Sequence, residues 1–445
     1  MSRYKPYPGH KDSRVEWIEQ IPEHWETKPI KRIVTCNDDS LDEQFDPTST
    51  IKYVDISSVS LTEGIGRSEK ILFSDAPSRA RRKAKEGDVV ISTVRTYLKA
   101  VAQVSEQHAD CVFSTGFAVL RAKKQFVYPP FLKWFSLNEL LIQSIECNSK
   151  GLSYPAINAS ELVDLPSVLP SEEEQKIIAE VLDKETNRID ALIAKKTRFV
   201  ELLKEKRQAL ITHAVTKGLD PNVKMKDSGV EWIGEVPEHW GVGPLKHWFS
   251  TTSGATPHTS KQDLYYDNEN GIPWIRTTDL TNGVIDSYEI GITEKAIEDT
   301  ACKVLPVNSV LLAMYGGAGT IGKNGKLNIT ACINQAVCAL LPSKKFDPDF
   351  TFFYIQFYRP YWMIGAVSTR KDPNISQDLV KETVIPRPPL SEQKAIADFL
   401  DFELKRIGLL ESKTQLSIDL LKERRSAFIT AAVTGQIDLR SEVNQ

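Results

Sequence analysis

Residues Gly317 to Asn324 form the segment of this chain that comes nearest to a nucleotide-binding motif. Their sequence, GAGTIGKN, follows the pattern G-x-x-x-x-G-K-[ST] except at its last position. In that pattern backbone amides and the lysine hold the phosphates, and the final hydroxyl binds the magnesium ion. Asn324 has no hydroxyl, so we interpret the segment as a glycine-rich turn between strands, whose amides could approach a DNA phosphate.

A second motif, Tyr128-Pro129-Pro130-Phe131, is similar to the [DNS]-P-P-[YF] motif of amino-group DNA methyltransferases. In those enzymes the first side chain helps to hold the exocyclic amine of a flipped base. Tyrosine is unsuited to that role, and no glycine-rich cofactor motif precedes it. Two prolines at the start of a helix explain the motif more simply. A stand-alone DNA methyltransferase or a nucleotide-hydrolysing enzyme therefore remains only the alternative function.

Histidine and cysteine, the usual metal ligands, give no sign of a metal site. The chain has seven histidines and six cysteines, without a C-x-x-C pair or a spacing typical of zinc ligands. Reduced thiols in a cytosolic protein are the simplest interpretation. We therefore expect no catalytic residue, no metal and no cofactor bound by this chain itself.

Composition and charge are those of an ordinary globular protein. Hydrophobic residues make up 41% and charged residues 26% of the chain, and no long apolar run predicts a membrane span or a signal peptide. We expect a cytoplasmic protein. The net charge of −3 excludes a nonspecific polycation but not DNA binding. It also motivates a further hypothesis, a coiled-coil scaffold without DNA contact.

The best candidate for binding a nucleic acid is the basic stretch from Arg79 to Lys99. It holds seven basic and two acidic residues around an expected strand, where cations could contact DNA phosphates. A solvated charged loop is the ordinary alternative, but we favour DNA contact. The second half of the chain offers weaker candidates. The candidate DNA-binding residues are Arg79, Arg81, Arg82, Lys83, Arg95, Tyr97, Lys99, Arg276, Lys323, Lys326, Arg370 and Lys371.

These candidates lie in a chain whose two halves repeat one another. Asp12 to Trp25 recurs as Asp227 to Trp240 at a constant offset of 215, with ten of the 14 positions identical. Gln175 to Asp220 aligns without a gap on Gln393 to Asp438, with 23 of 46 residues identical. A period this long indicates two copies of one large unit. We expect a pseudo-twofold molecule, and duplex DNA is the commonest partner of such proteins.

Each copy contains a long helix, which begins near Ser171 in the first and near Ser391 in the second. A serine N-cap followed by acidic residues is typical of a helix start. Apolar residues then recur with the 3.5-residue period of a coiled coil over roughly 60 Å of helix. We expect the two helices to pair with each other, the alternative being that each binds a different protein. The expected seam residues are Ile178, Leu182, Ile189, Leu192, Phe199, Leu203, Leu210, Ile396, Leu400, Ile407, Leu410, Leu421 and Phe428.

Two globular stretches of mixed α/β character lie between the repeats. Their faint similarity indicates one shared fold with divergent loops. Strands are expected at residues 51–56, 89–94, 117–120, 274–278, 310–314 and 336–341, and aromatic helices at 130–135 and 349–354. The expected domains are a docking segment at 1–25, globular domains at 26–170 and 241–389, a central region with its long helix and docking segment at 171–240, and a C-terminal region with its long helix at 390–445.

The duplicated phrase carries an unusual density of aromatic residues. Because both copies retain them, a structural or docking role is more plausible than catalysis. Tryptophan brings a large apolar surface to a short segment, which either packs on its own domain or forms part of a subunit-binding surface. Both interpretations remain open. The candidate docking residues are Trp17, His24, Trp25, Trp232, His239 and Trp240.

The repeated segments resemble those of type I restriction–modification specificity subunits. The resemblance rests on Asp227 to Trp240, on the run from Pro389 to Asp401 with its long helix, and on the ending from Ala431 to Arg440. It covers the whole chain, as two target recognition domains alternating with two helical regions. The N-terminal copy departs mildly from the pattern, with Arg14 for Gly229, Glu19 for Gly234 and Gln20 for Glu235, which we interpret as tolerated changes.

This resemblance implies a division of labour. Each recognition domain would read one half of a bipartite, asymmetric DNA sequence, and an antiparallel helix pair would set the distance between the halves. Two modification subunits would dock on the repeated regions and supply S-adenosylmethionine and adenine N6 methylation. Restriction subunits would supply ATP- and magnesium-dependent translocation and cleavage. The chain itself would catalyse nothing and would act in the cytoplasm of a bacterium or archaeon.

Overall fold

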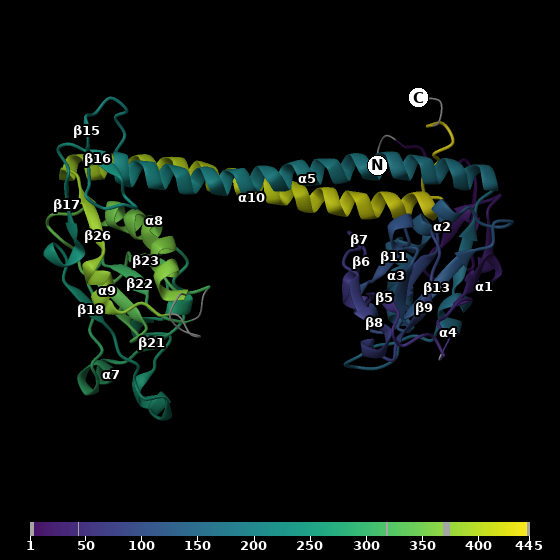
Figure 1. Cartoon of the computed structure of the whole chain (residues 1–445), viewed down its shortest axis with the longest axis horizontal. Helices are drawn as coiled ribbons and strands as arrows, with labels where there is room; N and C mark the ends of the chain where they lie inside the picture. Colours follow the sequence, from purple (N-terminus) through teal and green to yellow (C-terminus); the bar gives the residue numbers. More distant parts are fainter. Residues whose placement is uncertain (1–3, 43, 317–318, 368–373, 443–445) are drawn as a thin grey trace. The chain divides into compact units, whose positions relative to one another are not determined.

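The computed structural model describes residues 4–42, 44–316, 319–367 and 374–442. Its contacts divide the chain into two compact units, one formed by residues 1–197 with 415–445 and the other by residues 198–414. Each unit holds one globular stretch and part of both long helices (Figure 1). We call them unit 1 and unit 2 and describe each by itself. None of the helices in the described ranges is long and apolar enough to cross a membrane.

Unit 1 is built on two four-stranded sheets with the strand orders β11-β10-β13-β4 and β8-β5-β12-β9. The first sheet is antiparallel, whereas β5 and β12 pair in parallel in the second. Helix α2 packs on β10 and β13, and Pro129 and Pro130 form its first turn. The strands of these sheets are β4 Val34–Cys36, β5 Thr50–Val54, β8 Glu69–Leu72, β9 Ala80–Lys83, β10 Val89–Ser92, β11 Val101–Gln103, β12 Cys111–Ser114 and β13 Phe117–Ala122. The helices are α1 Ile30–Ile33, α2 Pro129–Ser136, α3 Glu139–Cys147 and α4 Ala159–Asp164.

Unit 2 has the related strand orders β18-β25-β22-β23-β20 and β21-β19-β24. Its central pair matches that of unit 1, because Val310 pairs with Leu340 as Val89 pairs with Leu120. The prediction that the two globular stretches share one fold is therefore confirmed. The strands are β18 Thr251–Ser253, β19 Ile272–Ile275, β20 Gly283–Ile285, β21 Gly291–Ile292, β22 Val310–Ala313, β23 Asn324–Leu327, β24 Cys332–Ile333 and β25 Val337–Leu340. The helices are α6 Gln262–Tyr265, α7 Glu294–Asp299, α8 Pro348–Val367 and α9 Gln377–Glu382.

Short two-stranded sheets close each globular stretch and each docking segment. The first and last strands of the stretches pair antiparallel, as β3 Glu26–Pro29 with β14 Pro166–Leu169 and β17 Gly241–Pro244 with β26 Val384–Arg387. The repeated phrases form hairpins of their own, and a small hairpin of unit 1 lies against β11. These hairpins are β1 His10–Asp12 with β2 Gln20–Pro22, β15 Met225–Asp227 with β16 Glu235–Pro237, and β6 Val59–Ser60 with β7 Gly64–Ile65.

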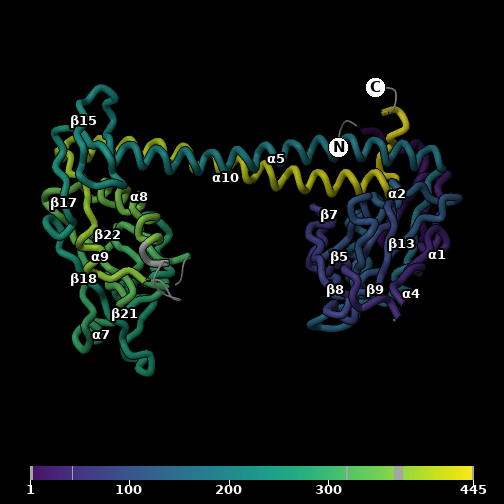
Figure 2. Tube along the Cα trace, viewed as in Figure 1, coloured from purple at the N-terminus to yellow at the C-terminus, as the bar shows by residue number. Residues whose placement is uncertain are grey.

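The two predicted long helices are α5 Glu172–Lys217 and α10 Leu390–Val433. Ser171 caps α5 as predicted, since its hydroxyl accepts a hydrogen bond from the backbone amide of Glu174 at 3.3 Å. Ser391 does not act in the same way, because α10 already begins at Leu390 and the serine lies inside the first turn. Within each unit the two helices lie side by side and run antiparallel (Figure 2).

Most seam residues enter the core of one unit or the other. Ile178, Leu182 and Phe428 belong to the core of unit 1, and Leu203, Ile396, Leu400 and Ile407 to that of unit 2. Ile189 is buried, and Leu210 and Leu421 are half-buried. Leu192, Phe199 and Leu410 are exposed over 40%, 43% and 40% of their surface. These three lie within about five residues of the points where the helices pass from one unit to the other.

A buried glutamine fastens the start of each long helix to its globular stretch. The Gln175 amide donates to the carbonyls of Phe126 and Pro170 at 3.1 and 3.0 Å and accepts from the Tyr128 amide at 2.7 Å. Gln393 repeats this pattern in unit 2 with Lys345, Pro388 and Asp347, at 3.1, 2.8 and 2.8 Å. A buried amide with every partner satisfied fixes one orientation. This explains why both copies carry glutamine at this position.

In both units the repeated phrase packs against the C-terminal end of a long helix. Trp240 follows α5 along the chain and contacts Gly218 just beyond that helix. Trp25 lies instead beside Gly435, which follows α10, so the first phrase and the last helix meet although they lie at opposite ends of the sequence. The Asp438 amide donates to the Lys5 carbonyl at 2.8 Å and fastens the two ends together.

Candidate nucleic-acid interface

The basic stretch from Arg79 to Lys99 is divided between the two sheets of unit 1. Arg81, Arg82 and Lys83 lie on β9, which is an edge strand of its sheet, and the cations there also discourage strand pairing with another molecule. Part of this charge is neutralised within the unit. The Arg79 guanidinium donates to the Tyr53 hydroxyl at 3.0 Å and to Asp55 at 3.2 Å, and Lys83 lies 3.8 Å from Asp39.

Arg95, Tyr97 and Lys99 follow the central strand β10 of the other sheet. A one-turn 3-10 helix, Thr96–Leu98, separates Arg95 from Lys99, and both flanking residues have a left-handed backbone. Tyr97 is exposed over 52% of its surface, and Lys99 lies 3.8 Å from Glu146. Arg95 lies over the Tyr154 ring at 5.1 Å. These residues form an exposed tip distinct from the β9 cluster.

Two of the three described candidates in unit 2 are engaged with carboxylates of their own unit. Arg276 donates to Asp279 at 2.9 Å and to Glu289 at 3.0 Å, and Lys326 forms an ion pair with Asp349. Lys323 lies in the turn before β23. The remaining two candidates, Arg370 and Lys371, lie outside the described residues.

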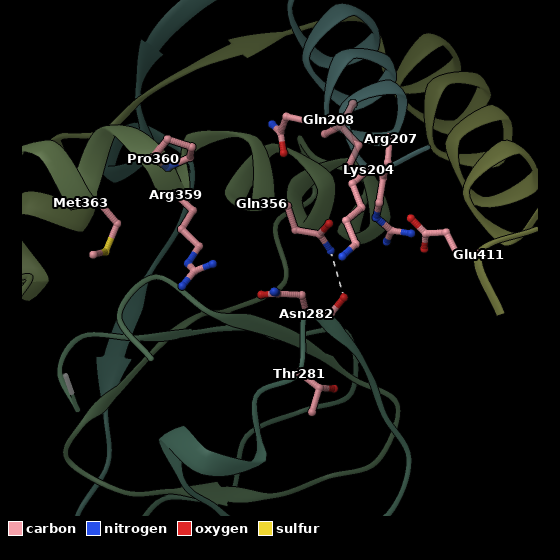
Figure 3. Close-up of a pocket in the computed structure, with 11 residues that line it drawn as sticks. Lys204, Arg207, Gln208, Thr281, Asn282, Gln356, Arg359, Pro360, Met363 and Glu411 are labelled. Atoms are coloured by element: carbon pink, nitrogen blue, oxygen red, sulfur yellow. Dashed lines mark hydrogen bonds between the residues drawn. The ribbon is translucent and has the colours of Figure 1, made fainter. Parts of the chain in front are cut away.

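A basic pocket of 560 Å³ in unit 2 was missed by the sequence analysis (Figure 3). Lys204 and Arg207 of α5 enter it from one side and Arg359 of α8 from another, with Glu411 of α10 as the carboxylate among its lining residues. In the described part of the chain, neither Lys204 nor Arg207 forms an ion pair. The three cations thus exceed the single acid. From the sequence alone, Lys204 and Arg207 would be interpreted as solvated charges on a long helix. The pocket is recognised only in the structure, where residues of α8 line it together with these two cations.

Unit 1 has a corresponding groove with a different charge balance. Lys422 and Arg425 of α10 align with Lys204 and Arg207, and they line a pocket together with Asp190 and Glu63. Arg425 Nε lies 2.9 Å from Asp190 Oδ1. Two acids therefore balance the two cations in this groove, which is less suited to a phosphate than the pocket of unit 2.

The near-match to a phosphate-binding loop is a turn between strands in its described part. In a nucleotide-binding loop the lysine opens a helix, whereas here Lys323 leads into β23. Asn324 is fully buried, and its side-chain amide donates to the Phe352 carbonyl at 2.9 Å. Gly322 has φ +69°, and a Cβ there would lie 2.7 Å from the Arg359 side chain. The glycine at position 322 is therefore explained by the backbone conformation and packing of the turn. Residues 317–318 of this motif lie outside the described residues.

The other chemical motifs also have structural explanations. Tyr128 is the N-cap of α2, so the two prolines occupy a helix start as predicted. The residues that the structure describes hold no group of three metal-ligating side chains. Burial raises the pKa of the Cys332 and Cys338 thiols to about 12, which keeps both protonated and unreactive near neutrality.

The docking residues occupy two different environments. Trp25 and Trp240 are 0% and 1% exposed, so each packs in the core of its own unit. Trp17 and Trp232 are half-buried. His24 and His239 are exposed and bind the first turn of a long helix: their Nε2 atoms lie 2.9 Å from Glu174 Oε1 and from Glu392 Oε2, respectively.

Replacing Glu174 by glutamine is expected to destabilise unit 1 by about 1.5–3 kcal/mol at neutral pH, because it removes charged hydrogen bonds from a buried site. Burial raises the pKa of Glu174, but hydrogen bonds from His24 and Ser171 outweigh it and lower the pKa below its ordinary 4.5. The stabilisation is therefore present above pH 4.5 and is lost as the pH falls through the lower, folded-state pKa. Urea unfolding of both proteins from pH 3 to 7 measures this.

The matched control for this prediction is Glu173→Gln, which changes an exposed carboxylate in the same turn of α5. It should leave the free energy of unfolding nearly unchanged. An equal effect of the two substitutions at all pH values would contradict the role assigned to Glu174.

Comparison with known proteins defines the class to which this arrangement belongs. The family model for the type I restriction modification DNA specificity domain matches the chain twice, over residues 22–202 and 237–417. The chain therefore belongs to this family and carries two specificity domains.

Its relatives include a protein named as the MjaX specificity subunit of a type I restriction enzyme from Methanocaldococcus jannaschii, 25% identical over 95% of this chain and 96% of that protein. The StySPI specificity subunit of Salmonella potsdam is 28% identical over 46% of this chain and 44% of its own length. The HsdS subunit from Thermoanaerobacter tengcongensis has a TM-score of 0.55 at 23% identity, covering 94% of this chain and 98% of that one. A structure concerned with complex assembly of the type I restriction–modification system reaches 0.77 at 23% identity, over 94% and 99%. These likenesses confirm the predicted fold.

Proposed function

We propose that this chain is the DNA sequence-specificity subunit of a type I restriction–modification complex. In this function each globular stretch is a target recognition domain that reads one half of a bipartite, asymmetric DNA sequence. The observation that carries the proposal is the double match to the specificity-domain family, over residues 22–202 and 237–417. The related strand orders of the two units and their different loops support it, because one scaffold with two different tips suits two different half-sites.

The chemistry of the complex would belong to other subunits. Two modification subunits would supply S-adenosylmethionine and adenine N6 methylation, and restriction subunits would supply ATP-dependent translocation and magnesium-dependent cleavage. The complex would act in the cytoplasm of a bacterium or archaeon. The modification subunits would dock on the repeated regions, where Trp17, His24, Trp232 and His239 remain at least partly accessible. Trp25 and Trp240, each buried in its own unit, would support that surface from the core.

Genome-wide mapping of N6-methyladenine tests the proposed function. A host that carries this gene should show methylation at one bipartite motif, and that motif should disappear when the gene is deleted. If deletion of the gene also removed methylation at all other motifs, the gene would not specify this one motif, and the result would contradict the proposal. Methylation of DNA or hydrolysis of ATP by the purified chain alone would instead support the alternative, an enzyme.

The pocket of unit 2 is proposed to hold a phosphate of the DNA backbone. Replacing Arg207 by alanine should then weaken binding about equally for all DNA sequences and reduce the slope of log affinity against log salt by about 1. The matched control is Arg198→Ala on the same helix, because Arg198 is already paired with Glu201 and Glu205 at 2.9 and 3.3 Å. Binding titrations at several salt concentrations measure both slopes. Equal slopes for the two variants would rule out this contact.

A further inference from the structure

Two loops of unit 1 form a single exposed tip at the end of β10. Residues 94–99 follow that strand and residues 150–155 follow α3, and we call them together the 94/150 tip. Backbone hydrogen bonds hold them together: the Ile157 amide donates to the Thr93 carbonyl at 2.9 Å and the Thr96 amide to the Pro155 carbonyl at 3.4 Å. The Thr96 hydroxyl also bonds the Ser149 hydroxyl at 2.9 Å. The tip is therefore built on the rigid sheet rather than attached by a free loop.

The backbone of the tip is arranged to turn side chains outward. Arg95 and Lys99 have φ values of 52° and 49°, although neither is glycine. Such left-handed residues cost free energy and persist where the surrounding structure enforces them, which is often at functional sites. Thr96 between them is buried. Because this residue points inward, its neighbours Arg95, Tyr97 and Leu98 point toward solvent.

The outward side chains form an exposed aromatic and apolar cluster. Tyr97 and Leu98 are exposed over 52% and 41% of their surface, Tyr154 is exposed over 66%, and Leu152 is fully exposed. Large apolar side chains gathered on a protein surface mark an interaction site. Here they lie beside cations, as expected of a surface that meets nucleic acid rather than another apolar surface.

Arg95 differs from the neighbouring cations in having no carboxylate partner among the described residues. Lys99 lies 3.8 Å from Glu146 and Lys150 lies 2.9 Å from Glu161, so their charges are partly matched. The Arg95 guanidinium instead lies over the Tyr154 ring at 5.1 Å. This contact is a cation–π interaction, and among the described residues no acceptor is hydrogen-bonded to the Arg95 guanidinium. Its N–H groups are therefore available for a bidentate contact.

Unit 2 repeats the base of the tip but not its sequence. The Ile375 amide donates to the Met314 carbonyl at 2.7 Å, as Ile157 does to Thr93 in unit 1. The chain between these anchors reads differently in the two units, with Gly316 at the position that matches Arg95. The same scaffold position thus carries different side chains in the two specificity domains. A difference at this position is what two domains with different targets require.

We propose that the 94/150 tip reads base edges in the half-site of unit 1, with Arg95 donating two hydrogen bonds to a guanine in the major groove. Tyr154 is the positioning residue, because it holds the guanidinium by its face. Leu152, the most exposed side chain of the tip, contacts a base through an apolar group such as the methyl of thymine. This assignment rests on the proposed function and adds to it the residues that specify one half of the target.

The test compares N6-methyladenine motifs in host cells that carry the gene with single substitutions. Arg95→Ala should leave the half-site of unit 2 unchanged and relax the requirement for guanine at one position of the other half-site, by on the order of 10- to 100-fold in discrimination. Arg95→Lys should relax the same position, since lysine keeps the charge but lacks the planar fork. Arg32→Ala, an exposed arginine on α1, is the matched control and should leave both half-sites unchanged.

Tyr154 provides the test of positioning. Tyr154→Phe keeps the ring and should preserve the motif, whereas Tyr154→Ala should relax the same guanine position as Arg95→Ala. Thermal unfolding of the purified variants should match that of the wild-type chain, because both side chains are exposed. Equal effects of the phenylalanine and alanine variants would overturn the stacking role.

Three outcomes would overturn the assignment. An unchanged motif in Arg95→Ala, at wild-type methylation levels, would show that Arg95 reads no base. Uniformly weaker methylation with the motif preserved would show a phosphate contact instead. If the wild-type gene produced no bipartite motif at all, the proposed function itself would fail and the tip assignment with it. In the first two outcomes the proposed function stands, so the two failures are distinguishable.

Discussion

Replacement of Trp240 by alanine is expected to lower the free energy of unfolding of unit 2 by about 3–5 kcal/mol. The indole is 1% exposed in the core of that unit, and its Nε1 donates to Glu392 at 3.1 Å. A Cβ on Gly218 would already lie 3.2 Å from the ring, so the site is tightly packed and would collapse poorly around a cavity. The loss therefore combines buried apolar surface, the cavity and one hydrogen bond to Glu392, which keeps its contact with His239. Chemical denaturation monitored by circular dichroism measures it.

The duplicated phrase supplies internal controls for this prediction. Trp25→Ala should destabilise unit 1 by a similar amount, since Trp25 is 0% exposed. Trp232→Ala, which removes a half-buried ring, should cost clearly less. Because the two units have separate cores, each substitution should shift the unfolding of one unit only. A single transition that moves equally for Trp25→Ala and Trp240→Ala would show that the units unfold together.

The repeats allowed much of this fold to be predicted from the sequence. All six predicted strand segments contain strands, and both aromatic runs are helices. These elements are decided locally, by β-branched runs bounded by turn residues and by prolines at a helix start. The long helices were predicted from a serine N-cap and a 3.5-residue apolar period. The N-cap prediction was wrong for Ser391, because α10 already begins at Leu390.

The division into compact units could not be predicted in the same way. The sequence suggests boundaries where repeated and unrepeated segments meet, near 170, 240 and 389. Compactness depends instead on which segments touch, and the last part of α10 joins the core of residues far away in sequence, such as Trp25 and Ile178. The backbone hydrogen bond between Asp438 and Lys5 is a second contact between distant segments, and no local feature of either segment predicts it.

The candidate DNA-binding residues were selected by charge, and charge alone does not show which cations are free. Arg79, Arg276 and Lys326 have carboxylate partners in Asp55, in Asp279 and Glu289, and in Asp349, respectively. Lys204 and Arg207 were passed over because helical surfaces are normally charged, yet α8 turns their surroundings into a pocket. Arg95 was selected for its charge, but its stacking partner Tyr154 lies 59 residues further along the chain (154 − 95) and is not predictable from the spacing.

A symmetric deletion in the long helices is expected to shorten the spacer between the half-sites. Residues 194–197 of α5 and 412–415 of α10 occupy equivalent places in the two repeats, so removing both sets keeps the two copies matched. Four helical residues correspond to about 6 Å of rise. This rise equals that of about two base pairs of DNA. Mapping N6-methyladenine in cells carrying the variant should therefore reveal a motif with the same half-sites and a shorter spacer.

Removal of seven residues from each helix, 191–197 and 409–415, separates length from helical phase. Four residues rotate the helix by about 40° beyond a full turn, whereas seven residues return it nearly to its original phase and keep the 3.5-residue seam in register. The seven-residue variant should thus shorten the spacer further, by about three base pairs, yet retain more methylation. Deletion of the exposed residues 220–222, which follow α5, is the control and should change neither spacer nor half-sites. The helices α5 and α10 each contribute to both units. If the spacer stayed unchanged in both helix-deletion variants, helix length would not set the spacing of the target.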